Sequence, residues 1–428
     1  MIPLPIREIA QLCPGKLEAA SGAEKATGVQ IDSRRVQPGD LFLAVRGGEA
    51  FVAEALKRGA AAALVPDDAF AALAALGRAV RERAGARVVG ITGSVGKTST
   101  KDILAALCRP HARTIAAEAS YNAELGVPLT LCRLEEDTRI CILELAMRGF
   151  GQIAELCEIA EPEIGVITSI APVHLEFVES LEGVARAKAE LLQALPDGAP
   201  VVVPADAAAL EPFLDERLDV IRFGLGGDVT LAAFDPPRLV ADVCGERVEL
   251  EVRFTAAHQA ANTLPALAAY RALGLPLDRA AAGAAQVEFS RLRGEEIELP
   301  GGGTLINDCW NASPVSMKAA LAHLVARAGG RRTVAVLGDM AELGPGAEAY
   351  HLEVGRSAAD AGVDVLVAIG PLARGYVEGA GDGAWAETVE EGIRELESLL
   401  QSGDCVLVKA SRAMGMEAVA EALTAVKA

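Results

Sequence analysis

The chain is predicted to be an α/β protein with mainly parallel sheets, because strand-like and helical runs alternate over most of its length. The strand-like runs are short and rich in Val and Ile, and the stretches between them are rich in Ala and Leu. A glycine-rich loop also joins one strand-like run to a helical run, which is where α/β domains bind phosphate groups. A chain of 428 residues is long enough for two to four domains of ordinary size.

Seven runs that end near glycine, proline or polar residues are predicted to form strands, at residues 86–92, 140–144, 164–168, 199–204, 333–337, 363–369 and 405–409. One domain boundary is expected near Gly85, where a charged helical stretch gives way to the first of these strands. A second is expected at the turn-rich cluster 300–303. We therefore expect three domains, at about 1–85, 86–298 and 299–428.

Composition excludes several classes of protein. The net charge of -19 argues against a nucleic-acid-binding surface. No apolar run approaches the roughly 20 residues that span a bilayer, and the first residues do not resemble a signal peptide. The eight cysteines are scattered without a C-x-x-C pair, so we expect buried, reduced thiols in a cytoplasmic protein rather than disulfides or a zinc site.

The clearest functional signal is the stretch from Gly93 to Thr98, which follows a predicted strand and precedes a helical run. Backbone N–H groups of such a loop bind phosphate, a lysine reaches the β- and γ-phosphates, and a hydroxyl binds Mg²⁺. The alternative is a glycine turn with a surface lysine, since the usual first glycine would fall at Ile91. The predicted ATP-binding residues of this loop are Thr92, Gly93, Ser94, Val95, Gly96, Lys97, Thr98 and Ser99.

The decapeptide Thr92–Lys101 resembles the phosphate loop of the Mur ligase family, although alone it is also similar to that of folylpolyglutamate synthetases. Further blocks similar to Mur ligases follow in the family's order between Asp32 and Glu417. The resemblance implies an N-terminal domain that binds a UDP-linked substrate and a central domain with a P-loop NTPase-like parallel sheet. It also implies a Rossmann-like C-terminal domain that binds the incoming dipeptide.

In the first domain, residues 32–42 are similar to the family's uridine-nucleotide segment, which implies that Ser33 and Arg34 bind substrate. Taken alone, this segment reads as a turn-rich loop with an exposed arginine pair. The chain departs from the family after Glu49, where an Asp-Gly-His stretch is missing and the loop at 47–52 is shortened.

In the second domain, residues 122–130 and 144–153 resemble family blocks that supply a substrate-binding Asn122 and a metal-binding Glu144. Two later blocks imply a metal ligand at His174 and, at Lys188, a lysine that carries a carbamate made from CO₂. Without the resemblance, His174 reads as a structural histidine and Lys188 as an exposed helix lysine. The implied catalytic residues are Lys97, His174 and carbamylated Lys188. The implied ligands of two Mg²⁺ ions are Thr98, Glu144, His174 and Lys188.

The remaining blocks imply nucleotide and substrate contacts. Residues 257–262 resemble an H-N-x-x-N segment in which Gln259 replaces the first asparagine, so Asn262 and His258 are carried over. Residues 290–295 offer either Arg291 or Arg293 to the phosphates, and Arg293 is taken as the ATP ligand. In the third domain, residues 307–314 are similar to D-D-x-Y-N-A-N-P, which implies that Asp308 contacts the nucleotide and that Asn311 and Ser313 contact substrate.

Together these blocks imply an ATP-dependent ligase that joins D-alanyl-D-alanine to UDP-N-acetylmuramoyl-tripeptide through an acyl phosphate. The reaction would be a cytoplasmic step of peptidoglycan precursor synthesis, catalysed by a monomer. The D-N-P-R motif of the relative that adds diaminopimelate or lysine is absent. Two alternatives stay open: another Mur-type ligase with a different amine, or a non-catalytic nucleotide-binding relative.

Overall fold

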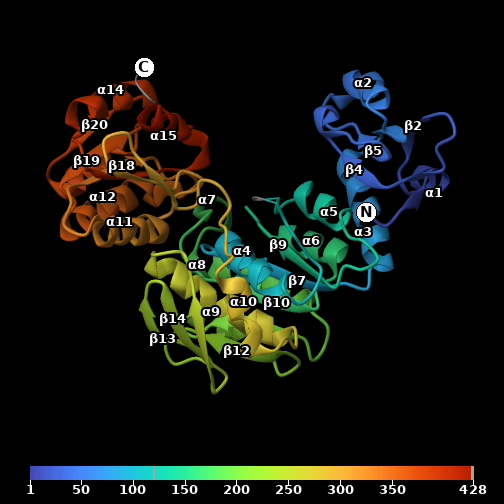
Figure 1. Cartoon of the computed structure of the whole chain (residues 1–428), viewed down its shortest axis with the longest axis horizontal. Coiled ribbons are helices and arrows are strands. Elements are labelled where there is room, and N and C mark those ends of the chain that lie inside the picture. Colours follow the sequence, from blue (N-terminus) through green and yellow to red (C-terminus); the bar gives the residue numbers. More distant parts are fainter. Residues whose placement is uncertain (119–120, 426–428) are drawn as a thin grey trace.

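The computed structural model describes residues 1–118 and 121–425, and its sheets follow one another along the chain from the N-terminus to the C-terminus (Figure 1). The N-terminal sheets lie at one end of the molecule, a nine-stranded sheet lies in the middle, and a six-stranded sheet lies at the other end. The architecture is α/β with mainly parallel sheets, as the alternating sequence pattern predicts.

The N-terminal part contains a two-stranded and a four-stranded sheet, the latter in the order β2-β6-β5-β4. Their strands are β1 (Leu4–Pro5), β2 (Gly15–Ala19), β3 (Lys25–Ala26), β4 (Gly28–Gln30), β5 (Asp40–Leu43) and β6 (Ala62–Pro66). The helices are α1 (Ile6–Leu12), η1 (Ser33–Arg35), η2 (Gly48–Phe51), α2 (Val52–Lys57) and α3 (Ala69–Arg83). Asp68 caps α3 by accepting hydrogen bonds from the N–H groups of Phe70 and Ala71.

The nine-stranded sheet has the order β15-β14-β13-β12-β11-β10-β7-β9-β8, parallel from β8 to β13 and antiparallel beyond. Its strands are β7 (Arg87–Thr92), β8 (Thr114–Ala116), β9 (Ile140–Glu144), β10 (Ile164–Ile167), β11 (Pro200–Pro204), β12 (Asp219–Phe223), β13 (Val229–Asp235), β14 (Arg238–Val243) and β15 (Glu246–Glu251). The helices are α4 (Lys97–Cys108), α5 (Gly126–Leu131), α6 (Gln152–Ala160), α7 (Leu175–Val178), α8 (Leu181–Ala194), η3 (Ala208–Phe213), α9 (Ala257–Ala272), η4 (Leu277–Arg279) and α10 (Ala281–Ala284).

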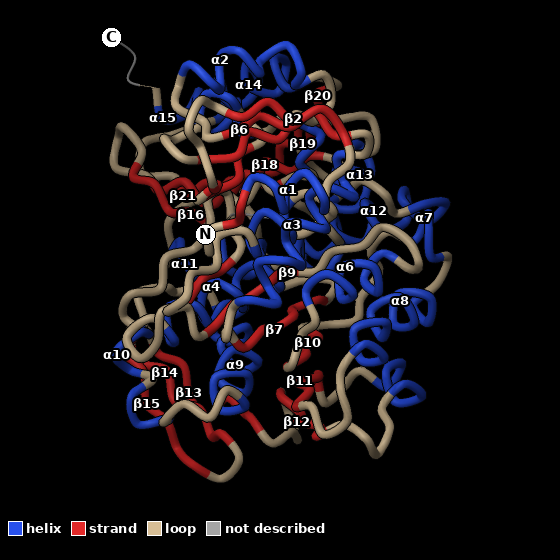
Figure 2. Tube along the Cα trace, turned by 90° about the vertical axis from the view of Figure 1, so that its right-hand side faces the viewer, coloured by secondary structure: helices blue, strands red, loops and turns tan. Residues whose placement is uncertain are grey.

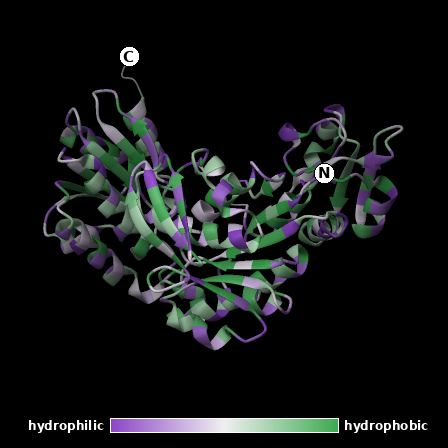
Figure 3. Cartoon of the chain, turned by 60° about the horizontal axis from the view of Figure 1, so that its bottom comes forward, coloured by the Kyte–Doolittle hydropathy of each residue, from purple (hydrophilic) through white to green (hydrophobic). Residues whose placement is uncertain are grey.

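Helices cover both faces of this sheet, with α6 and α8 on one side and α4 and α9 on the other (Figure 2). Successive side chains of a strand point to opposite faces, so Val88 belongs to the first core and Val89 to the second. The strands in the middle of the molecule are accordingly hydrophobic along their length, while hydrophilic residues gather on the outer helices and loops (Figure 3).

The six-stranded sheet has the order β16-β17-β21-β18-β19-β20, and only the β16–β17 pair is antiparallel. Its strands are β16 (Glu295–Glu298), β17 (Thr304–Asn307), β18 (Thr333–Gly338), β19 (Val365–Ile369), β20 (Ala384–Ala386) and β21 (Cys405–Lys409). The helices are α11 (Pro314–Ala328), η5 (Gly344–Gly346), α12 (Ala347–Asp360), α13 (Arg374–Ala380), α14 (Val389–Leu399), η6 (Arg412–Met414) and α15 (Glu417–Thr424). Because β16 is part of it, this sheet begins before residue 299, where the sequence places the last boundary.

Each of the seven strand-like runs contains an observed strand, whereas the antiparallel strands β13 to β15 were not among the predictions. All eight cysteines are free, and seven are buried, Cys244 being exposed. Within residues 1–118 and 121–425, no helix has both the length and the apolar character needed to cross a bilayer.

Candidate active site

The phosphate loop joins the end of β7 to the start of α4, and two glycines in the left-handed region shape it. Gly93 has φ +145° and Gly96 has φ +86°. A Cβ atom at Gly93 would lie 2.0 Å from Thr168 Oγ1, and one at Gly96 would lie 2.5 Å from Asn262 Oδ1. Only glycine therefore fits either position, both for backbone conformation and for space.

Hydrogen bonds to the segment after β10 hold the loop in place. Ser94 N–H donates to Ser169 O at 3.0 Å, and Val95 N–H donates to Ser169 Oγ at 2.9 Å. Thr168 Oγ1 donates to Val95 O at 2.6 Å. The loop is thus fixed at the carboxyl ends of neighbouring parallel strands, the edge at which open α/β sheets bind ligands.

Lys97 is the first residue of α4 and folds back over the loop. Its Nζ donates to Gly93 O at 2.6 Å and to Ser94 O at 3.4 Å. Burial lowers the pKa of Lys97, the carboxylate of Glu144 raises it, and the charge of Arg293 lowers it. The ammonium group therefore sits where the loop and the helix N-terminus together would meet an anion.

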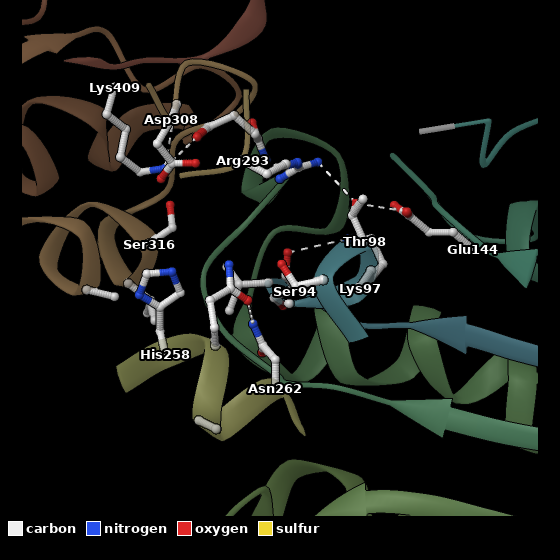
Figure 4. A pocket seen from close by; sticks show the side chains of 18 residues that line it. Ser94, Lys97, Thr98, Glu144, His258, Asn262, Arg293, Asp308, Ser316 and Lys409 are labelled. Carbon is white, nitrogen blue, oxygen red and sulfur yellow. Dashed lines mark hydrogen bonds and ion pairs between the residues drawn. The ribbon is translucent and has the colours of Figure 1, made fainter. Parts of the chain in front are cut away.

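Glu144, at the end of β9, is the centre of a hydrogen-bonded group beside Lys97 (Figure 4). Thr98 Oγ1 donates to Glu144 Oε2 at 2.8 Å, and Asn122 Nδ2 donates to Glu144 Oε1 at 2.8 Å. Arg293 Nη2 in turn donates to Thr98 Oγ1 at 3.2 Å. A buried carboxylate and a hydroxyl in contact are oxygen donors of the kind Mg²⁺ prefers.

A cavity of about 250 Å³ lies between the phosphate loop, α9 and the start of the C-terminal part. His258 and Asn262 reach it from α9, and Asp308 reaches it from the end of β17 (Figure 4). Burial lowers the pKa of His258 to about 4, so its ring is neutral at physiological pH. Lys409 Nζ holds Asp308 by an ion pair to Oδ2 at 2.6 Å and also donates to Asn311 O at 2.9 Å.

A second cavity, of about 530 Å³, opens on the other side of Lys97 and Glu144. Asn122 and His174 line it from the central part, and Ser313 lines it from the start of α11. The residues that line both cavities form what we call the shared wall: Lys97, Glu144, Arg293 and Asn311. A ligand in one cavity therefore meets a ligand in the other at these four side chains.

His174 lies in the second cavity and connects the central part to the C-terminal part. Its Nδ1 is 2.5 Å from Glu342 Oε2, and Arg148 Nε lies 3.3 Å from the other oxygen of Glu342. Burial lowers the pKa of His174, while the carboxylate of Glu342 raises it. Both His174 and Glu342 have positive φ, so each lies at a sharp turn that aims its side chain.

Lys188 is buried in α8, with 2% of its surface exposed. Within residues 1–118 and 121–425, no hydrogen bond or ion pair holds its Nζ, and burial and the charge of Lys97 are the influences that act on it. Burial and the charge of Lys97 hold the pKa of Lys188 well below the usual lysine value of 10.5. A neutral amine is the form of lysine that reacts with CO₂, so this surrounding fits a carbamate.

The structure brings most of the predicted site residues to the two cavities, and five line neither of them: Thr92, Gly93, Lys188, Ser33 and Arg34. Neither Ser33 nor Arg34 lines either cavity: both lie in η1 of the N-terminal part, and Arg34 pairs with Asp32 at 2.8 Å. Of the two candidate arginines, Arg293 lines both cavities, whereas Arg291 lines neither. Within the described ranges, no group of three His, Cys, Asp or Glu side chains could hold a metal ion. The predicted magnesium ligands are not such a group, because Thr98 and Lys188 are of other residue types.

Three residues without a predicted role also belong to the site. Glu342 contacts His174, Lys409 holds Asp308, and Arg412 lines the larger cavity. Lys409 and Glu342 lie at or after the carboxyl ends of β21 and β18, so strand position is a signal that could have found them.

Two family models match the chain. The model described as Mur ligase middle domain matches residues 91–270, and the model described as Mur ligase, glutamate ligase domain matches residues 292–412. The chain is 36% identical to a Mycobacterium bovis UDP-N-acetylmuramoyl-tripeptide--D-alanyl-D-alanine ligase, over 99% of this chain and 98% of that protein. It is 30% identical to the Bacillus subtilis protein of the same name, over 99% of both chains.

Solved structures give the same result. Crystal structure I of MurF from Acinetobacter baumannii matches with a TM-score of 0.87 and 27% identity, over 99% of both chains. The MurF ligase from Thermotoga maritima, solved in complex with ADP, matches with a TM-score of 0.78 and 26% identity, over 93% of this chain and 97% of that one.

Proposed function

The chain belongs to the Mur ligase family, and from that membership we propose that it joins D-alanyl-D-alanine to UDP-N-acetylmuramoyl-tripeptide in peptidoglycan precursor synthesis. It is an ATP-dependent amide ligase that forms ADP and phosphate. The observation of the structure that supports the proposal is the shared wall, because the cavity beside the phosphate loop and the larger cavity meet at Lys97, Glu144 and Arg293.

In the first step, a carboxylate oxygen of the tripeptide attacks the γ-phosphorus of ATP, an acyl phosphate forms and ADP leaves. Lys97 and Arg293 offset the negative charge that develops on the transferred group. Asn262 and His258 border the nucleotide in the smaller cavity, and Asp308, held by Lys409, borders its other side. Since the reacting groups are held at one wall, much of the rate comes from positioning.

In the second step, the dipeptide amine attacks the acyl carbon, phosphate leaves and the amine loses a proton. Asn122, Asn311 and Ser313 line the cavity in which these groups meet. Mg²⁺ supplies charge neutralisation for the phosphates, and Thr98, Glu144, His174 and a carbamate on Lys188 are the groups that would hold it. The N-terminal part, with Ser33 and Arg34, would hold the UDP end of the substrate. We place the reaction in the cytoplasm and expect a monomer.

We infer the carbamate because the buried amine of Lys188 has no hydrogen-bond or ion-pair partner among the described residues. The neutral amine attacks CO₂, a C–N bond forms and one proton is released, which yields a negative group beside Lys97. Carbon-13 NMR of the native protein in labelled bicarbonate should show one carbamate signal that a Lys188→Met variant lacks. No difference between the two spectra would remove Lys188 from the ligand set.

The function itself is tested by phosphate release. With ATP, Mg²⁺ and UDP-N-acetylmuramoyl-tripeptide, we expect D-alanyl-D-alanine to support turnover. Diaminopimelate or lysine, tested with the corresponding dipeptide precursor, should not. Turnover with those amines instead would assign the chain to another Mur-type activity, and no turnover with any amine would favour a non-catalytic relative.

A Lys97→Ala variant tests the role of the phosphate loop in this assay. We expect a loss of about 100-fold or more in kcat, because removal of one group that stabilises transition-state charge typically costs that much. The unfolding temperature should stay within a few degrees of the wild type, which separates lost chemistry from lost fold. Near-normal turnover would contradict the assigned role of Lys97.

A further inference from the structure

The incoming dipeptide has an amine at one end and a free carboxylate at the other, and the two groups require different contacts. Its amine must reach the acyl carbon at the shared wall, and its free carboxylate then lies at most about 7 Å away, which is the reach of two extended residues. A carboxylate that leaves water needs a positively charged partner. The larger cavity should therefore hold a cation at about that distance from the shared wall.

Four basic residues line this cavity: Lys97, Arg148, Arg293 and Arg412. Lys97 and Arg293 belong to the shared wall and face the nucleotide as well. Arg148 comes from the central part and pairs with Glu342 at 3.3 Å. Arg412 lies in η6, which follows the last strand, β21, of the six-stranded sheet.

The guanidinium group of Arg412 is half-exposed and has two neighbours that orient it. Glu417 Oε1 pairs with its Nη1 at 2.5 Å, and its Cζ lies 5.4 Å from the centre of the Trp310 ring. The same ring lies 5.8 Å from Arg293 Cζ, so Arg412 and an arginine of the shared wall are neighbours of one aromatic ring. Since guanidinium has five N–H donors in one plane, donors remain after the pair with Glu417.

Resting on the proposed function, we propose that Arg412 binds the terminal carboxylate of the dipeptide and so makes the enzyme select amines with a free carboxyl end. Glu417 and Trp310 orient the guanidinium group before the substrate arrives, which reduces the entropy lost on binding. Arg293, on the same ring, faces the acyl phosphate.

A matched control exists on the surface of the same part. Arg374 Cζ lies 6.0 Å from the centre of the Trp385 ring, and Arg374 Nε pairs with Glu378 at 3.4 Å. This Arg–Trp–Glu group has the same composition but lines neither cavity. Any general effect of removing an arginine that stacks on tryptophan should therefore show in Arg374→Gln.

The test compares D-alanyl-D-alanine with D-alanyl-D-alaninamide, which lacks the negative charge. For the wild type we expect the KM of the acid to be about 10- to 100-fold below that of the amide, from a charge-assisted hydrogen bond. Arg412→Gln should raise the KM of the acid by that factor and leave that of the amide nearly unchanged, whereas Arg374→Gln should keep the wild-type preference. The KM values of ATP and of the nucleotide peptide should stay unchanged in Arg412→Gln.

Three results would overturn the inference. One is an unchanged acid-over-amide preference in Arg412→Gln, and another is an equal loss for acid and amide. The third is loss of the preference in Arg148→Gln instead. If the wild type shows no turnover with the dipeptide at all, the proposed function fails. A second assay then tests ATP use alone: the acyl phosphate that forms without amine is trapped by reduction.

Discussion

Helix α8 and the end of strand β21 each bury a lysine, yet the two surroundings are opposite. Lys409 is paired with Asp308 at 2.6 Å and donates to a backbone carbonyl. Lys188 is buried to the same degree, and no carboxylate among the described residues forms an ion pair with it. The first lysine therefore joins its neighbours through an ion pair, while burial drives the second toward the neutral amine by lowering the pKa of Lys188. Burial alone does not define the role of a lysine; the partner does.

The largest difference should appear in activity. Lys188→Ala should lower kcat by about 1000-fold, because it removes the amine that carries the negative ligand. Formate or acetate added to this variant should restore part of the rate by occupying the space of the carbamate. Phosphate release measures both effects. Full activity in the variant would show that Lys188 has no catalytic role that distinguishes it from Lys409.

The second difference should appear in stability. Lys409→Met leaves the carboxylate of Asp308 without its cation in a largely enclosed site, which should lower the free energy of unfolding by about 3 kcal/mol. Lys188→Met should not lower it by more than about 1 kcal/mol, because the aliphatic stem still packs and no ion pair is lost. Urea unfolding of the two variants side by side measures this; equal losses would show that the surroundings do not differ in energy.

The third difference concerns pH. Burial lowers the pKa of Lys188 below 10.5 in the folded chain, so between the lowered value and 10.5 the unfolded chain binds more protons than the folded one. Raising the pH through this interval should therefore stabilise the wild type relative to Lys188→Met. Unfolding in bicarbonate-free buffer from about pH 7.5 to about pH 10 measures the change. A difference that is constant with pH would mean that the amine is not perturbed.

The smallest effect is expected from a neighbour of Lys188 on the same helix. The carboxylate of Glu190 accepts hydrogen bonds from Gly151 N–H at 2.7 Å and Ala154 N–H at 3.1 Å, at the start of α6. Glu190→Gln should cost about 0.5–1 kcal/mol of stability, typical of a lost charge at a helix N-terminus. Turnover should remain near the wild-type value. A loss as large as that of Lys188→Ala would mean that disturbance of α8, rather than the amine, explains the first prediction.

Local sequence was sufficient to predict what depends on a few consecutive residues. The β7 strand, the glycine turns and the start of α4 all follow from one stretch of chain. Contacts between distant segments could not be predicted in this way. His174 and Glu342 are 168 positions apart, and nothing in either segment alone indicates that their side chains meet.

Local sequence also fails to predict how strands pair at the ends of the two large sheets. The β16–β17 hairpin crosses the turn-rich cluster at 300–303, so the six-stranded sheet begins at Glu295, before the predicted boundary at 299. The antiparallel strands β13 to β15 extend the central sheet with alternating exposed residues, a pattern that short apolar runs do not reveal.

Because Lys97, Glu144, Arg293 and Asn311 line both cavities, the two compartments differ in contents but share one partition. A single inhibitor that reached across this partition, with a phosphonate in place of the transferred group, would link two weak binders into one molecule. The second half would then bind at the high effective concentration that a short linker provides. The architecture thus favours bisubstrate compounds over molecules that compete with the nucleotide alone.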